Sequence, residues 1–187
     1  MRKVILDLAV TLDGFIEGPN GEIDWCIMDT DIGAGEKSFL ETFPEEIDTV
    51  FYGRKSYELY GNYQPEKESG FKDFYDKINQ MKKYIFSSTL NNAGEHTVIR
   101  DNIIKEVNQI KNQKGKDIWL FGGASLITDF INNNLIDEYR LAVHPVILGD
   151  GKPLFQSIKQ RLNLELIEAK PSKSGVTSLY YKPVSVK

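Results

Sequence analysis

The chain has 187 residues, and 23 Lys and Arg against 27 Asp and Glu give a formal net charge of −4. This length suits one domain, and the absence of a basic block argues against nucleic acid or an anionic membrane as the main partner. One cysteine and two histidines exclude an internal disulfide and are too few for a structural zinc site, so we expect no bound metal.

The N-terminal segment begins with an apolar run at residues 4–10 that Asp7 interrupts after three apolar residues. The run is too short for a membrane span and no small-residue cleavage site follows, so we interpret it as a strand and the protein as cytoplasmic. Further apolar segments of strand length occupy residues 49–52, 84–86, 97–99, 118–121, 139–147, 164–169 and 177–181.

Between the earlier strands, apolar residues recur at the spacings of three and four that are typical of amphipathic helices. These stripes begin at Phe39, Phe71, Ile103 and Leu126. Strands that alternate with helices predict crossover connections and a mostly parallel sheet with helices on both faces. Turn sequences at 149–151 and 172–175 leave no room for a long helix between the last two strands, so antiparallel strands should close the sheet. We expect one α/β domain over residues 1–187, with longer loops at 11–25 and 61–70.

The most informative segment is 118–127, where a buried strand runs into Gly122 and Gly123 and then into a helix. Two successive glycines let the backbone approach a ligand closely, and the helix start offers unpaired N–H groups and the positive end of its dipole. The segment therefore indicates a phosphate site, although a glycine pair after a strand is also typical of a plain tight turn.

Three other strand ends carry similar chemistry, at residues 9–16, 53–58 and 87–89. Ligands of open α/β sheets bind at the carboxyl ends of the strands, so these junctions should lie together. Taken one by one, they also fit an Asp-Gly turn, a solvated basic turn and a cap of three hydroxyls.

Together the junctions predict a long polyanionic ligand, and a dinucleotide with an additional 2′-phosphate suits them. Arg54, Lys55 and Ser87 would meet the 2′-phosphate, which leaves the pyrophosphate for the glycine pair. The G-x-G-x-x-G pattern is absent, because the glycines at 33 and 35 lack a third and follow no strand. A P-loop is absent too, since Glu36 stands where a glycine is needed, which argues against ATP hydrolysis.

The order of these motifs resembles the dihydrofolate reductase superfamily, and within it the reductase domain of bacterial riboflavin biosynthesis proteins. The resemblance covers nearly the whole chain and rests on the motifs at 9–14 with the loop to 25, 53–58, 87–89, 121–126, 137–139 and 144–151. It implies a three-layer dihydrofolate-reductase-like fold with an antiparallel C-terminal strand in a mostly parallel sheet. It also implies NADPH as the hydride donor and homodimers.

The resemblance further implies roles for individual residues. The adenosine phosphate end of NADPH would be met by Gly53, Arg54, Lys55, Ser56, Ser87 and Ser88. The pyrophosphate and nicotinamide side would be lined by Gly122, Gly123, Ala124 and Ser125. Ala9, Gly14 and Ile16 would frame the nicotinamide beneath a gating loop.

Hydride addition also needs a proton, and the candidates for its donor are less clear in the sequence. In dihydrofolate reductases a carboxylate near the start of the first helix holds the pterin, and Asp29, Asp31 and Glu36 lie in that neighbourhood. Each also fits a solvated acid at a helix start. Asp7, inside the first strand, could face the pocket or have a structural role.

Three other side chains are candidates near the substrate. His144 could donate a proton or be a hydrogen-bonded structural residue, and Trp25 and Phe121 could stack on a flat heterocycle or belong to the core. The catalytic candidates are thus Asp7, Glu36 and His144, and the substrate-binding candidates are Trp25, Asp31 and Phe121.

Phe121 stands where the resemblance to riboflavin-pathway reductases leads us to expect a glutamate. The leading hypothesis is an NADPH-dependent reductase of a small flat heterocycle, similar to a pterin or a ribosylaminopyrimidine. The alternative is a non-catalytic NADPH-binding protein that acts as a sensor or scaffold. We also expect a homodimer, because the C-terminal strands leave a sheet edge that needs cover.

Overall fold

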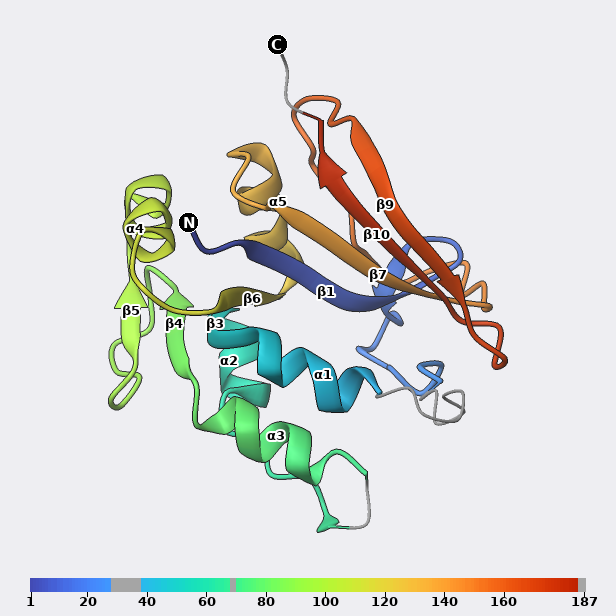
Figure 1. Ribbon diagram of the computed structural model, residues 1–187, viewed down its shortest axis with the longest axis horizontal. Coiled ribbons are helices and arrows are strands. Elements are labelled where there is room, and N and C mark those ends of the chain that lie inside the picture. Colours follow the sequence, from blue (N-terminus) through green and yellow to red (C-terminus); the bar gives the residue numbers. More distant parts are fainter. Residues whose placement is uncertain (28–37, 68–69, 185–187) are drawn as a thin grey trace.

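The computed structural model describes residues 1–27, 38–67 and 70–184, and its centre is an eight-stranded sheet in the order β5-β4-β3-β6-β1-β7-β10-β9 (Figure 1). The strands are β1 (Val4–Thr11), β3 (Ile47–Gly53), β4 (Lys82–Phe86), β5 (Thr97–Ile99), β6 (Asp117–Gly122), β7 (Glu138–His144), β9 (Leu164–Pro171) and β10 (Thr177–Pro183). Neighbouring strands from β5 to β7 are parallel, and β10 pairs antiparallel with both β7 and β9. The predicted α/β fold with antiparallel C-terminal strands is confirmed.

Helices cover both faces of the sheet, with α4 and α5 on one side and α1, α2 and α3 on the other (Figure 1). Their bounds are α1 (Phe39–Glu46), α2 (Arg54–Tyr60), α3 (Lys72–Asn79), α4 (Ile103–Lys111) and α5 (Ala124–Asn132). The α1 helix starts with a capping box, in which Ser38 and Glu41 satisfy each other's backbone N–H groups. None of the described helices is long and apolar enough to cross a membrane.

Two apolar cores lie on the two faces of β1. Leu6 packs into the core beneath α4 and α5, and Ile5 packs with Phe43 and Trp119 beneath α1 and α3. Side chains alternate between the faces of a strand, so Asp7 shares the α1 face with Ile5. A ligand can therefore contact the Asp7 side chain only from the α1 face of the sheet.

Two details differ from the prediction. The strand expected to reach residue 147 ends at His144, because Pro145 has no N–H to donate and the Val146 N–H donates to the His144 carbonyl oxygen at 2.8 Å in a tight turn. The expected loop at 11–25 contains a short strand, β2 (Phe15–Glu17), which pairs with β8 (Lys152–Pro153) in a separate two-stranded sheet. This pairing is between distant segments, so local patterning could not reveal it.

Candidate functional site

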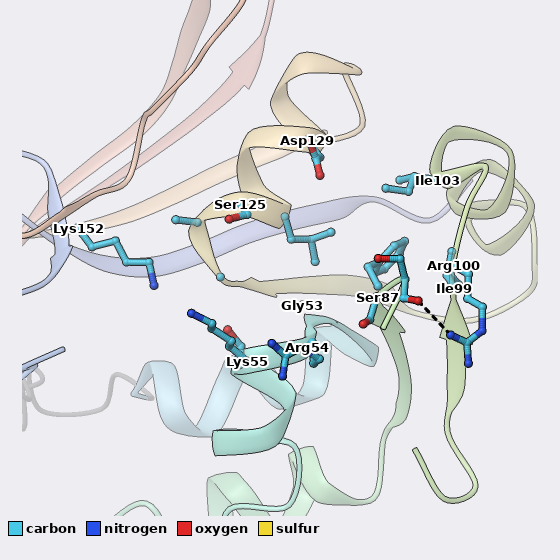
Figure 2. Close-up of a pocket in the computed structure, with 16 residues that line it drawn as sticks. Gly53, Arg54, Lys55, Ser87, Ile99, Arg100, Ile103, Ser125, Asp129 and Lys152 are labelled. Carbon is cyan, nitrogen blue, oxygen red and sulfur yellow. Dashed lines mark hydrogen bonds between the residues drawn. The ribbon is translucent and has the colours of Figure 1, made fainter. Parts of the chain in front are cut away.

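A cavity of about 480 Å³ lies at the carboxyl ends of β3, β4 and β6, against the N-terminus of α5 (Figure 2). It brings together nine of the predicted cofactor-binding residues: Gly53, Arg54, Lys55, Ser56, Ser87, Ser88, Gly123, Ala124 and Ser125. It also contains Arg100 and Lys152, which the sequence analysis missed. Arg100 directly follows β5, and this place at a strand end could have identified it from the sequence. No sequence pattern pointed to Lys152.

The glycines of this cavity belong to two turns that pack against each other. A Cβ atom on Gly53 would lie 3.4 Å from the Gly122 carbonyl oxygen, and one on Gly123 would lie 3.1 Å from Ser56 Oγ. Gly122 has a φ of +113°, in the left-handed region that favours glycine, and its peptide bond to Gly123 is cis. A side chain at Gly53 would thus be in ordinary contact with the β6–α5 turn, one at Gly123 would need Ser56 to shift slightly, and Gly122 requires glycine for its backbone conformation.

Positive charge dominates the wall made by α2 and β5. The Arg54 guanidinium donates to both carboxylate oxygens of Glu58 at 2.9 and 3.0 Å, and both side chains are more than 40% exposed. Such an exposed pair contributes little free energy, so Arg54 can turn to an anion at low cost. Arg100 Nη1 donates to the Ser88 carbonyl oxygen at 3.5 Å, which holds its guanidinium at the cavity (Figure 2).

Ser87 also has the structural role that the sequence left open. Its Oγ accepts the N–H groups of Thr89 and Leu90 at 3.2 and 2.9 Å, so it caps the turn after β4. Oγ also lies 3.4 Å from Thr89 Oγ1, and when Thr89 donates in that contact the Ser87 hydroxyl hydrogen is available as a donor. Capping the turn and donating to an anion are therefore compatible.

Asp7 lies on the α1 face of β1, partly exposed, and burial raises the pKa of its carboxyl to about 7. Within the described part of the chain, this carboxyl accepts no hydrogen bond. Arg140 is its register partner on β7, and its positive charge lowers the pKa only partly. The guanidinium is engaged elsewhere, with Glu138 at 2.7 Å and Glu46 at 2.9 Å. Asp7 is thus an unpaired acid that exchanges its proton near neutral pH.

Phe121 belongs to an aromatic cluster on the same face of the sheet. Its ring centroid lies 4.8 Å from Tyr52, 4.9 Å from Trp119 and 5.3 Å from Tyr60. Phe121 stays partly exposed, so it contacts the core and still offers apolar surface. Both interpretations of Phe121 that the sequence left open are compatible with this position.

His144 is 2% exposed and has neighbours from the segment before α1. Its Nδ1 accepts the Ile27 N–H at 3.1 Å, its Nε2 lies 3.8 Å from Cys26 Sγ, and its ring meets the Trp25 ring edge-on at 5.3 Å. An accepting Nδ1 places the proton of the neutral ring on Nε2. Because burial lowers the pKa of His144, the ring is neutral at pH 7 and anchors residues 25–27, which favours the structural alternative.

The His144 environment predicts a pH-dependent loss of stability. Its pKa is lower in the folded than in the unfolded chain, so its contribution is present above about pH 6.5 and is lost as the pH falls through the folded pKa. The melting temperature of His144→Gln should therefore fall less than that of the wild type between pH 7.5 and pH 5. Thermal melts at both pH values measure this difference, and parallel decreases would contradict it.

The remaining predicted residues lie outside the cavity. Ala9 follows Asp7 on the same face of β1, Gly14 accepts the Leu154 N–H on its carbonyl oxygen at 2.9 Å, and Ile16 packs against the core beneath α5. Gly122 contributes to the close turn but not to the lining. Asp31 and Glu36, like Asp29, lie outside the described residues. No cluster of three metal-ligating side chains occurs among the residues that were placed.

Comparisons with known proteins agree with this architecture. The crystal structure of a putative riboflavin biosynthesis protein from Shewanella sp. PV-4 has a TM-score of 0.78 at 18% identity, covering 99% of this chain and 100% of that one. Dihydrofolate reductase from Enterococcus faecalis, solved with NADP(H) and RAB-propyl, has a TM-score of 0.65 at 14% identity, covering 98% and 97%. These similarities show a shared fold.

Sequence comparison shows the family directly. YyaP from Bacillus subtilis (strain 168), an uncharacterized protein, is 52% identical over 183 residues, which are 96% of this chain and 94% of YyaP. YwjB from the same strain, also uncharacterized, is 35% identical over 167 residues, with 88% and 89% covered. The model of the RibD C-terminal domain matches residues 2–178. This chain therefore belongs to the RibD C-terminal domain family.

Proposed function

We propose that this protein is an NADPH-dependent reductase of a small flat heterocycle, similar to the riboflavin-pathway reductase or to dihydrofolate reductase. The observation that carries the proposal is the cationic cavity at the carboxyl ends of β3, β4 and β6. Asp7 lies on β1, the strand next to β6 in the sheet. Such a reduction requires two things from the protein: a site that binds the anionic cofactor and an acid whose pKa lets it donate a proton.

The cavity residues fit a polyanionic dinucleotide. Its volume lies within the roughly 300–1,000 Å³ of small-molecule sites. Its lining includes the cations Arg54, Lys55, Arg100 and Lys152 against one acid, Asp129. The glycine turns leave backbone surface where side chains would obstruct a pyrophosphate, and α5 directs its positive end toward it. When bound, NADPH would supply the hydride.

The chain's own contribution to the chemistry is a proton and a surface for the substrate. A hydride added to the electron-poor carbon of a C=N or C=O bond leaves negative charge on its nitrogen or oxygen. Asp7 would donate its carboxyl proton to that atom and take a new proton from solvent, and a pKa of about 7 suits both steps. Phe121 and its aromatic neighbours would offer a flat apolar surface to the heterocycle.

The decisive experiment combines binding and turnover. Calorimetry with NADPH should give saturable heat, and NADPH consumption should be measured with dihydrofolate and with 5-amino-6-(5-phosphoribosylamino)uracil as separate substrates. Turnover of either heterocycle supports the reductase and identifies its substrate type. No heat with NADPH at millimolar concentration would overturn the proposal.

A second candidate function is a non-catalytic NADPH-binding protein that acts as a sensor or scaffold. The observation that favours it is Phe121, an aromatic residue packed against Tyr60 and Trp119 where a riboflavin-pathway reductase is expected to have an acid. Tight NADPH binding without turnover of any heterocycle in a broad panel would support this alternative over the reductase.

We also propose a homodimer built on the β9 side of the sheet. Leu166 and Ile167 of β9 are 53% and 50% exposed at the end of the strand order. Uncovered strand edges invite pairing with another chain, and a second copy would bury these side chains. Light scattering should give twice the chain mass of 21.3 kDa at micromolar concentration, and a 21.3 kDa species throughout would contradict the dimer.

A further inference from the structure

The short sheet formed by β2 and β8, hereafter the β2–β8 ribbon, carries a cation into the cavity. The ribbon is held in place by the Leu154 N–H, which donates to the Gly14 carbonyl oxygen at 2.9 Å, and by the Gly149 N–H, which donates to Asp13 Oδ2 at 2.8 Å. Lys152 of β8 lines the cavity. Figure 2 shows its ammonium group and that of Lys55 directed toward each other from opposite walls.

Glu17 of β2 now partners Lys152. The Lys152 Nζ atom lies 3.1 and 3.3 Å from the two Glu17 carboxylate oxygens, and the side chains are 39% and 37% exposed. Ion pairs with this much solvent contact contribute little to stability, because water screens the charges. Lys152 is therefore held at the cavity by a partner that it can leave at little cost.

The negative charge of Glu17 also acts on a residue of α2. Burial raises the pKa of Tyr60 on α2, and the negative charge of Glu17 raises it further. Tyr60 ends the helix that starts with Arg54 and Lys55. Because Glu17 occupies Lys152 in an ion pair, it should weaken the binding of an anion by that lysine.

We propose that Lys152 binds the pyrophosphate of the dinucleotide, and that Glu17 competes for it by pairing with Lys152 in the free protein. This inference rests on the proposed function. Two cations facing each other beside the α5 N-terminus match a doubly charged pyrophosphate, and a charge-assisted bond to phosphate is stronger than an exposed ion pair. Binding exchanges one partner of Lys152 for the other.

The position of Lys152 also predicts which phosphate it meets. In Figure 2 it lies on the side of Ser125 and Lys55, apart from Ser87 and Arg100. Ser87 belongs to the group assigned to the 2′-phosphate from the sequence. Lys55 was assigned to the same group, but its position opposite Lys152 places it on the pyrophosphate side instead. Because the pyrophosphate is common to NADPH and NADH, the loss of Lys152 should weaken both nucleotides alike.

Calorimetric titration of NADPH and NADH into four proteins tests the exchange: wild type, K152Q, E17Q and the double variant. K152Q should weaken both nucleotides about tenfold, because a charged partner of the pyrophosphate is lost. E17Q should tighten both by up to about fivefold, because the competing ion pair is removed. The double variant should bind like K152Q, since Glu17 acts through Lys152.

A matched ion pair elsewhere provides the control. Lys77 Nζ on α3 lies 2.8 Å from Glu45 Oε1 on α1, and the side chains are 47% and 64% exposed. K77Q and E45Q should leave both affinities unchanged. K152Q binding like the wild type, a loss confined to NADPH, or an E17Q effect that persists without Lys152 would overturn the inference. A wild-type protein that binds neither nucleotide would instead refute the proposed function.

Discussion

Asp7→Asn is expected to stabilise the folded protein at pH 8 while it removes most of the turnover of the proposed reductase. The folded pKa of Asp7 is about 7, against about 3.9 in an unfolded chain. Its stabilising contribution is therefore complete below pH 4 and is lost as the pH rises to about 7. Asn carries no charge, so the advantage of the variant should grow over this interval and stay constant above it, at on the order of 2–4 kcal/mol.

Urea unfolding at pH 4.5 and pH 8 measures this gain. Asp73→Asn, which replaces an exposed carboxylate on α3, is the matched control and should not stabilise the protein at pH 8. Equal stabilities of Asp7→Asn and the wild type at pH 8 would mean that the Asp7 carboxyl finds a partner in solution.

The same substitution should lower kcat by about 10²–10⁴, because Asn cannot donate a carboxyl proton to the reduced bond. NADPH affinity should stay unchanged, since Asp7 does not line the cavity that would hold the phosphates. Steady-state kinetics beside calorimetry separates the two effects. A stable variant with normal NADPH binding and wild-type kcat would remove Asp7 from the mechanism.

Arg54→Ala is expected to separate the two nicotinamide nucleotides. The guanidinium lies at the start of α2, where it pairs with the exposed Glu58, and it would form a charge-assisted bond to the 2′-phosphate. Such a bond is worth roughly 1.5–3 kcal/mol, so the dissociation constant of NADPH should rise about 10- to 100-fold while that of NADH changes little. Calorimetric titrations of both nucleotides measure the ratio.

Arg161→Ala, at an exposed arginine between α5 and β9, is the control for loss of general positive charge and should affect neither nucleotide. If Arg54→Ala weakened the binding of NADPH and NADH equally, the contact of this arginine would be assigned to the pyrophosphate instead. That outcome would also make its effect indistinguishable from the one expected of Lys152.

Much of the fold could be predicted from the sequence because it depends on local periodicity. Apolar runs and stripes at spacings of three and four identified the strands and helices, and their alternation indicated parallel pairing. The junctions after β3, β4 and β6 were predicted to lie together because the carboxyl ends of parallel strands share one edge of a sheet. Nine of the predicted cofactor-binding residues do line one cavity there.

The sequence by itself thus determined the layered architecture and the edge where phosphate-binding groups gather. Only the tertiary structure decided what individual side chains can do, because their charge states and partners come from residues far away in the chain. The pKa of Asp7 is about 7 because the carboxyl is buried and the nearby Arg140 is paired with two glutamates, and burial lowers the pKa of His144, whose Nδ1 accepts the Ile27 N–H. Lys152 reaches the cavity because β8 pairs with β2, more than 130 residues earlier. Desolvation and long-range pairing leave no periodic signal in a sequence.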